Sequence, residues 1–345
     1  MNASVSTVAA SPTQQTASLP TDVSGPLTTG DLQAMYCTMV RIREFEECVA
    51  DHVVAGEIKT PCHLYIGQEA IATGVCAHLQ CSDTIWGGHR SHGHYLAKGG
   101  DLRAALAEIY GKATGCSGGR GGSMHLVSPD HGILGTVPIV AATVPLAVGA
   151  ALASKLQSSR SVAVAFFGDG TLEEGHVHES MNLAGLYNLP IVFVCENNLY
   201  ASHMHLSERR VLDALVDAGR FHGIKGVTVD GNDIEEVWRV AGEAIERART
   251  GQGPSFLECL TFRWRGHVGP SWDEDVGVMR KDELKNWLPK DPVARAGNEL
   301  RKRGVPAAEL ERVKQVAARE VAAALEDAQN SPYPPADGLS DCVFV

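Results

Sequence analysis

Predicted strands and helices alternate through the middle of the chain. Continuous apolar runs at 161–167 and 190–195 are typical of strands covered on both faces, and the segment 173–186 between them has helix-like sequence. A strand, a helix and a second strand in this order form a βαβ unit, which implies parallel strands with helices packed against them. The same pattern continues with strands predicted at 226–230 and 255–260 and a helix at 234–249 between them.

Helical spacing dominates the flanking segments. After Thr29, apolar residues recur at near-helical intervals, at Leu32, Met35, Tyr36, Met39, Val40 and Ile42. Further helices are predicted at 67–78, 101–110 and 291–329, and the small apolar residues of 141–154 predict a fully buried helix. We therefore expect an α/β fold with a mostly parallel sheet flanked by helices.

One domain accounts for most of the length. Residues 1–26 are rich in Ser, Thr, Ala and Pro, which have little to bury, so we expect a flexible leader there. Residues 27–335 form the predicted α/β domain, and 336–345 form a short C-terminal tail.

The composition narrows the classes of protein that fit this fold. Hydrophobic residues make up 44% and charged residues 21% of the 345 positions, as in globular proteins. The net charge of −11 argues against a nucleic-acid partner, which requires a basic face. Residues 1–40 contain no Lys or Arg, unlike targeting segments, and no apolar run reaches the roughly 20 residues of a membrane span. Nine cysteines without a CxxC pair favour reduced thiols. We expect a cytoplasmic protein with no membrane partner.

A glycine-rich turn follows the strand at 161–167. It reads Gly168-Asp169-Gly170-Thr171 and lies at the carboxyl end of that strand, where open α/β sheets bind ligands. The glycines permit a sharp turn and close approach to an anion, and the amides of Gly170 and Thr171 can face phosphate oxygens. Asp169 supplies a hard oxygen ligand for a metal ion.

The next strand brings a second set of oxygen ligands to the same edge. Asn198 offers an amide oxygen and Tyr200 a backbone carbonyl, 29 positions beyond Asp169 in the case of Asn198. One βαβ crossover explains this separation. Together with two diphosphate oxygens and a water molecule, these groups complete an octahedral Mg²⁺ shell.

At these residues the sequence resembles a known family. The pair GDG…NN, within FGDGT…NLPIVFVCENN, resembles the thiamine diphosphate signature of the alpha subunit of the first component of 2-oxoacid dehydrogenase complexes. That family includes pyruvate, branched-chain and acetoin dehydrogenases. The resemblance covers about residues 30–335, and further matching motifs are HLYIGQEA at 63–70, HRSHG at 89–93, GRGGSMH at 119–125, VPLAVG at 144–149 and RGH at 265–267.

The resemblance implies a thiamine diphosphate-binding fold of the diphosphate type and assigns the cofactor's contacts. It implies that His89 and Arg90 contact the diphosphate, where the family more often has Tyr before the Arg, and that Val140 lies beside the aminopyrimidine. It implies Mg²⁺ ligands at Asp169, Asn198 and the Tyr200 carbonyl. The chain departs from the family at Pro138, Ala141 and Ala142, where Gly or Ser is common, so a potassium site known in some relatives is not expected.

Three of the fourteen histidines are candidates for catalysis. His267 follows a strand in a Gly/Arg-rich loop, as the family's active-site loop does, and is expected near the reacting carbon. His63 resembles a substrate-side histidine of the family. His92 is expected to support the same pocket. The loop that follows, 268–276, differs from that of pyruvate enzymes, which leaves the substrate open between a 2-oxoacid and acetoin.

The resemblance also implies partners. In the family, the glutamate that activates the cofactor comes from a separate beta subunit, in a heterotetramer of two alpha and two beta chains, and a lipoyl domain of an acyltransferase accepts the acyl group. Glu69 begins a predicted helix and is not assigned the activating role. Three alternatives stay open: a non-oxidative decarboxylase or transketolase-like subunit, a non-catalytic alpha-like subunit, and an NAD-binding domain, although the glycine run at 115–122 does not directly follow a strand.

Overall fold

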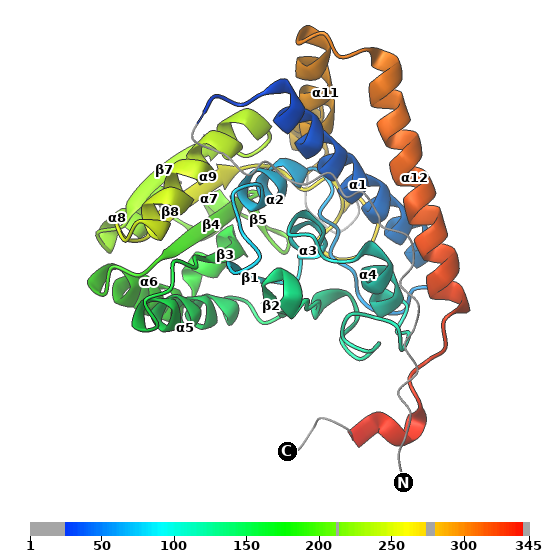
Figure 1. Cartoon of the computed structure of the whole chain (residues 1–345), viewed down its shortest axis with the longest axis horizontal. Helices are drawn as coiled ribbons and strands as arrows, with labels where there is room; N and C mark the ends of the chain where they lie inside the picture. Colours follow the sequence, from blue (N-terminus) through cyan, green and yellow to red (C-terminus); the bar gives the residue numbers. More distant parts are fainter. Residues whose placement is uncertain (1–24, 212–213, 274–279, 341–345) are drawn as a thin grey trace.

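A parallel sheet of six strands forms the centre of the molecule (Figure 1). The computed structural model describes residues 25–211, 214–273 and 280–340. The strands lie in the order β2-β1-β3-β4-β8-β7, and all neighbouring pairs are parallel. Their bounds are β1 Thr84–Gly87, β2 Ile133–Thr136, β3 Ala163–Gly168, β4 Ile191–Asn197, β7 Lys225–Asp230 and β8 Ser255–Leu260. The predicted α/β fold with a mostly parallel sheet is confirmed.

Both faces of the sheet are covered, because successive side chains of each strand point to opposite sides. Val164 and Phe166 pack toward one core, and Ala165 and Phe167 toward the other. The first core is closed by α2 (Glu69–Cys76), α3 (His92–Ala97) and α9 (Ile234–Arg249), and the second by α5 (Thr143–Leu156), α6 (Gly175–Leu186) and α8 (Val216–Phe221), which lie on the other side of the sheet in Figure 1.

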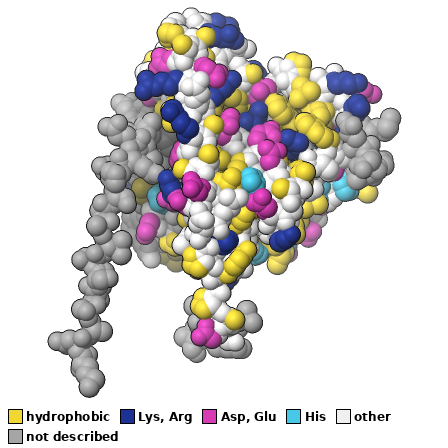
Figure 2. Space-filling model, turned by 90° about the vertical axis from the view of Figure 1, so that its right-hand side faces the viewer, with side chains coloured by type: hydrophobic (Ala, Val, Ile, Leu, Met, Phe, Trp, Pro, Cys, Tyr) yellow, Lys and Arg dark blue, Asp and Glu magenta, His cyan; other side chains and the backbone are white. Residues whose placement is uncertain are grey.

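A further helical layer packs outside α2 and α3. The long helices α1 (Thr29–Val54) and α12 (Ala307–Asn330) lie side by side at the right of Figure 1, with α4 (Leu102–Ile109) against α12 and α11 (Pro292–Lys302) against α1. Thr28 caps α1 in a capping box with Asp31. Figure 2 views the molecule from the α12 side and shows acidic and basic side chains intermixed, with no broad basic area in this view.

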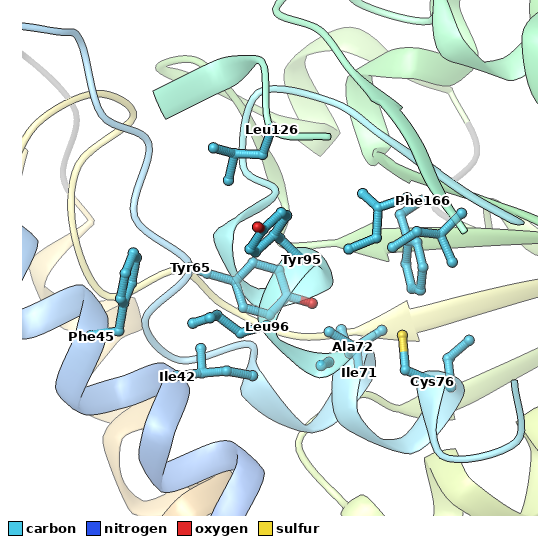
Figure 3. Packing of buried hydrophobic residues seen from close by; sticks show 14 of the residues in the cluster. Ile42, Phe45, Tyr65, Ile71, Ala72, Cys76, Tyr95, Leu96, Leu126 and Phe166 are labelled. Atoms are coloured by element: carbon cyan, nitrogen blue, oxygen red, sulfur yellow. The ribbon is translucent and has the colours of Figure 1, made fainter. Parts of the chain in front are cut away.

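Tyr65 joins the helical layer to the sheet. In Figure 3 its ring lies beside Leu96 of α3, with Phe45 of α1 farther to the left, and its hydroxyl points toward the sheet. That hydroxyl donates a hydrogen bond to the Glu196 carboxylate of β4. A buried tyrosine needs such a partner, so this bond fixes how the helical layer sits against the strand that ends at the site.

Several elements differ from the sequence expectations. The helix at 141–154 is not fully buried: in the described chain, Leu146 of α5 is 51% exposed, and Pro145 and Gly149 are exposed as well. One side of this helix packs against the sheet, and the small apolar residues of its other side are exposed to solvent. The four-residue strands β1 and β2 are too short for a periodic signal and were not predicted. In the part of the chain that the structure describes, the remaining elements are β5 (Tyr200–Ala201), β6 (Met204–His205), α7 (Leu206–Arg209), α10 (Lys281–Trp287) and five 3₁₀ turns, Gly122–Met124, Pro129–His131, Asp169–Glu173, Leu288–Lys290 and Ala336–Ser340.

The two predicted terminal segments fall partly outside the described residues. The leader expected at 1–26 lies outside them up to residue 24, and the tail expected at 336–345 from residue 341. No helix among the described residues combines the length and apolar character needed to cross a bilayer.

Candidate functional site

A cavity of about 330 Å³ opens where β1, β3 and β4 end, roofed by the loop after β8. Parallel strands deliver their following loops to one edge, which is where sheets of this kind bind ligands. The lining includes every residue predicted for the site except His92, namely His63, His89, Arg90, Val140, Gly168, Asp169, Gly170, Thr171, Asn198, Tyr200 and His267.

The predicted turn at the end of β3 places Asp169 at the floor of the cavity. Asp169 is 1% exposed and begins a 3₁₀ turn, so α6 starts only at Gly175. A Cβ on Gly170 would lie 2.7 Å from the Ala201 side chain, which explains why this position needs glycine. Burial raises the pKa of Asp169, and Arg209 offsets part of that shift.

The end of β4 places Asn198 opposite this turn. Its side-chain nitrogen donates to the Gln68 Oε1 at 3.1 Å, and its Oδ1 accepts from the Tyr200 amide at 3.3 Å. Leu199 between them has φ 71°, a left-handed conformation that is costly for a branched-chain residue. Asn198 is thus held with its amide oxygen on the loop side. Gln68 was not singled out in the sequence, although it belongs to the quoted motif at 63–70.

Arg209 balances the negative charge of Asp169 and Glu173. From α7 its guanidinium forms ion pairs with both Asp169 and Glu173, and its side chain is 5% exposed. A buried carboxylate without a counter-charge is unfavourable, so the guanidinium supplies the positive charge that the chain needs at this point. No sequence signal marked Arg209, because one arginine in a polar loop has no distinguishing pattern.

Three histidines converge at the other end of the cavity. The ring centroids of His63 and His89 are 4.5 Å apart, those of His63 and His267 are 5.1 Å apart, and those of His89 and His267 are 5.4 Å apart. Burial, followed by the charge of Arg90, lowers the pKa of His63 to about 3, of His89 to about 2 and of His267 to about 4. All three imidazoles are therefore neutral at pH 7.

Arg90 ties two loops of this histidine end together. Its Nη1 donates to the Leu64 carbonyl at 2.6 Å and its Nη2 to the His267 carbonyl at 3.2 Å. Burial and the nearby charge of Arg263 lower the pKa of Arg90 to about 9. Part of the guanidinium fork that was expected to face a diphosphate is thus used to position the histidines.

Asp273 holds the loop that carries His267. Its Oδ2 accepts from the His267 amide at 2.8 Å and from Arg263 Nη1 at 3.1 Å, and Arg280 Nη1 lies 3.6 Å away. Burial by itself raises the pKa of Asp273, but these donors outweigh it and the pKa falls below the ordinary value. Asp273 also adopts φ 53°. The part of the predicted loop 268–276 beyond Asp273 lies outside the described residues.

His92 does not line the cavity. It is fully buried, with its Nδ1 2.9 Å from Glu46 Oε2 and its Nε2 2.8 Å from Ser123 Oγ. Both ring nitrogens are thus satisfied inside the wall, which indicates a supporting role and no direct contact with a ligand. Glu69 begins α2 as expected and pairs with Arg43 at 2.5 Å, also away from the lining.

Glu196 lines the cavity beside Asn198 and was not predicted. It accepts hydrogen bonds from the Tyr65 hydroxyl and from His94 Nε2, the latter at 2.9 Å, and the His94 ring stacks on Phe166. Its position next to the Asn-Asn pair is the signal that could have identified it.

Val140 lies at the rim and is 44% exposed. The next residue, Ala141, has φ 67°, a conformation that glycine adopts at lower cost. The departure from the family pattern at Ala141 therefore coincides with a strained backbone.

Comparisons with known proteins find relatives over most of the chain. A family model described as "Dehydrogenase E1 component" matches residues 37–337. The chain is similar to the alpha subunit of acetoin:2,6-dichlorophenolindophenol oxidoreductase from Bacillus subtilis, with 42% identity over 90% of this chain and 92% of that protein. It is 39% identical to the subunit of the same name from Cupriavidus necator, over 96% and 98% of the two chains. It is 38% identical to the pyruvate dehydrogenase E1 component subunit alpha of Zymomonas mobilis, over 91% and 89%.

Proposed function

The chain belongs to the dehydrogenase E1 component family, and on this basis we propose that it is the alpha subunit of a 2-oxoacid or acetoin dehydrogenase that holds Mg²⁺ and thiamine diphosphate in the cavity at the sheet edge. The family resemblance drawn from the motifs is confirmed, and membership implies use of thiamine diphosphate. The observation that carries the proposal is that one cavity joins a hard oxygen site to a cluster of neutral histidines.

The end of the cavity formed by Asp169, Asn198 and Tyr200, called the oxygen end, has donors that fit Mg²⁺. Asp169 supplies a carboxylate, Asn198 an amide oxygen and Tyr200 a backbone carbonyl, and Mg²⁺ prefers oxygen ligands of these kinds. The turn at Gly170 admits no side chain, which leaves its backbone open to a diphosphate. The ion would take over the charge balance that Arg209 provides at Asp169.

The histidine end fits the reacting part of the substrate. Thiamine diphosphate, when bound, supplies a nucleophilic carbon that attacks a 2-oxo group. His63 and His267 are neutral and can donate a hydrogen bond to an oxygen on which negative charge develops. His89 and Arg90 would contact the diphosphate. Val140 would contact the aminopyrimidine through its backbone.

A beta subunit would complete the site. Among the described residues that line the cavity, the only acidic side chains are Asp169, Glu174 and Glu196; Asp169 is proposed for the metal, and Glu196 is engaged with Tyr65 and His94. We assign the activating glutamate to the partner chain. The exposed apolar side chains of Ile139, Val140 and Leu146 beside the cavity offer it a surface, and a lipoyl domain would approach the same opening.

The test is reconstitution with the beta chain. Binding of thiamine diphosphate and Mg²⁺ would be measured by calorimetry, and turnover by release of product from acetoin and from a series of 2-oxoacids, with and without a lipoyl acceptor. Asp169→Ala is expected to abolish cofactor binding, whereas Asp217→Ala, at an exposed position of α8, serves as the matched control. Unchanged binding in Asp169→Ala would overturn the site, and full turnover without any acceptor would favour a non-oxidative enzyme.

A further inference from the structure

The histidine end of the cavity has the composition of a transition-metal site. One ring nitrogen from each of His63, His89 and His267 lies within 4.8 Å of the other two. We propose that these three histidines bind a divalent transition-metal ion of the Zn²⁺ or Co²⁺ class when the cofactor is absent. This site is separate from the oxygen donors of Asp169 and Asn198, which suit Mg²⁺.

The spacing of the rings agrees with three imidazoles around one ion. A Zn–N bond is about 2.0–2.1 Å and the ring centroid lies about 1.1 Å beyond the nitrogen, so two imidazoles at a tetrahedral angle have centroids about 5 Å apart. The three observed separations are 4.5, 5.1 and 5.4 Å. The rings are already at the required distances, and rotation about their side-chain bonds would turn the nitrogens inward.

The nitrogens are chemically available. Only a neutral imidazole has a free lone pair for a metal, and all three rings are neutral at pH 7. Nδ1 of His63 is buried and has no hydrogen-bond partner among the described residues, which is unfavourable unless a ligand occupies it. A metal ion would satisfy this atom.

Two arginines oppose a bare cation at this place. The positive charges of Arg90 and Arg263 both lower the pKa of His267, and Arg90 donates a hydrogen bond to the His267 carbonyl. The three histidines and Arg90 all line the cavity, so an anion in the cavity could reach both the metal and the Arg90 guanidinium. We therefore expect the metal to bind together with an anion such as inorganic phosphate, which balances the added charge.

His89 decides whether the site exists. The family more often has tyrosine at this position, and with tyrosine only two histidines would remain. Two imidazoles make a weak site, whereas three with an open fourth position form a known zinc arrangement. The site is therefore a property of this chain and of relatives that share His89.

Occupation by a transition metal would block the cavity. This consequence rests on the proposed function, because His89 is assigned to the diphosphate and His63 and His267 to the substrate. Bound Zn²⁺ would keep these side chains from those groups, so metal and Mg²⁺–thiamine diphosphate would exclude each other.

The experiment measures metal binding directly on the full-length chain, without substrate. Zn²⁺ is titrated by calorimetry in the presence of inorganic phosphate, and Co²⁺ is followed by its visible absorption, which distinguishes nitrogen from thiolate ligands. We expect one ion per chain with nitrogen ligands. His89→Tyr is expected to weaken binding at least about tenfold, since even loss of a partner outside the coordination shell costs that much. His63→Asn is expected to do the same.

The matched control is His222→Asn. His222 and His178 form another histidine pair, with ring nitrogens 3.2 Å apart, and neither residue lines the cavity. Unchanged binding in His89→Tyr, or loss of binding in His222→Asn, would overturn the proposal. Circular dichroism of each variant verifies the fold. Competition by Mg²⁺–thiamine diphosphate is a separate measurement: its failure would contradict mutual exclusion, while the metal titration tests the site itself even if no 2-oxoacid is turned over.

Discussion

The two ends of the cavity are built in different ways. The oxygen end stands on the ends of two adjacent parallel strands, β3 and β4, whose register fixes Gly168 opposite Glu196. The histidine end collects His63, His89 and His267 from loops far apart in the sequence and holds them through Arg90 and Asp273. Sheet geometry positions the first end, whereas hydrogen bonds from buried charged side chains position the second. A substitution that disrupts one end of the cavity should therefore leave the other end intact.

The largest expected effect is a loss of activity when the loop that carries His267 is no longer held in place by Asp273. Asp273→Asn keeps a residue that tolerates φ 53° but removes the charge that Arg263 and the His267 amide face. We expect kcat to fall about a hundredfold, the scale of a misplaced catalytic group, with almost unchanged affinity for Mg²⁺–thiamine diphosphate. Steady-state kinetics and calorimetry of the reconstituted enzyme measure the two quantities. Asp282→Asn, at an exposed residue that pairs with Lys285, is the control. Parallel loss of cofactor affinity would show that the ends are not separable.

A second change targets the oxygen end. Arg209→Gln leaves Asp169 and Glu173 without their shared counter-charge, which should lower the free energy of unfolding of the metal-free chain by about 2 kcal/mol. Added Mg²⁺ should restore more stability to this variant than to the wild type, because the ion replaces the missing charge. Thermal unfolding with and without Mg²⁺ gives both values. Arg220→Gln breaks an exposed pair with Asp217 and should change neither. Equal stabilisation of variant and wild type by Mg²⁺ would refute the idea that Arg209 balances the metal site.

The smallest expected effect is a pH dependence that belongs to the histidine end. The pKa of His63 is about 3 in the folded chain and about 6.5 in an unfolded one, so below about pH 6.5 the unfolded chain binds a proton that the folded chain does not. Stability is therefore fully present above that pH and falls as the pH drops toward the folded value. Between pH 7.5 and pH 6 we expect His63→Asn to lose about 0.8 kcal/mol less than the wild type in urea unfolding. The exposed His125→Asn should follow the wild type, and identical pH profiles for His63→Asn and the wild type would contradict this assignment.

The oxygen end could be predicted from residue order because a general rule connects sequence to space. Consecutive strands of a βαβ unit end at the same edge, so Asp169 and Asn198 had to meet whatever the loops did. The convergence of His63, His89 and His267 had no such rule and came from the family resemblance. Asp273 and Arg209 were missed because an ion pair between distant segments leaves no periodic pattern in either one. Whether His92 faces the cavity or only supports it could not be predicted: its neighbours in sequence line the cavity, but its own ring turns into the wall toward Glu46.

The fold was predictable to a similar degree. Long elements such as β4 and α9 carry enough apolar periodicity to be recognised, while β1 has four residues and owes its place to its neighbours. The segment at 141–154 shows a different limit. A run of small apolar residues predicts burial, but it does not distinguish burial within the same chain from burial against another chain.

If the proposed beta subunit covers the exposed side of α5, the production of the two chains is linked. Leu146 and Gly149 remain open on a helix whose other side is sealed against the sheet, immediately beyond the strained Ala141 at the cavity rim. Newly made chains in excess of the beta subunit would expose this apolar surface to solvent, next to an active site that lacks its partner's residues. Exposed apolar surfaces favour self-association. Balanced synthesis of the two chains would then serve solubility as much as catalysis, and a surplus of either one would be a burden on the cell's chaperones and proteases.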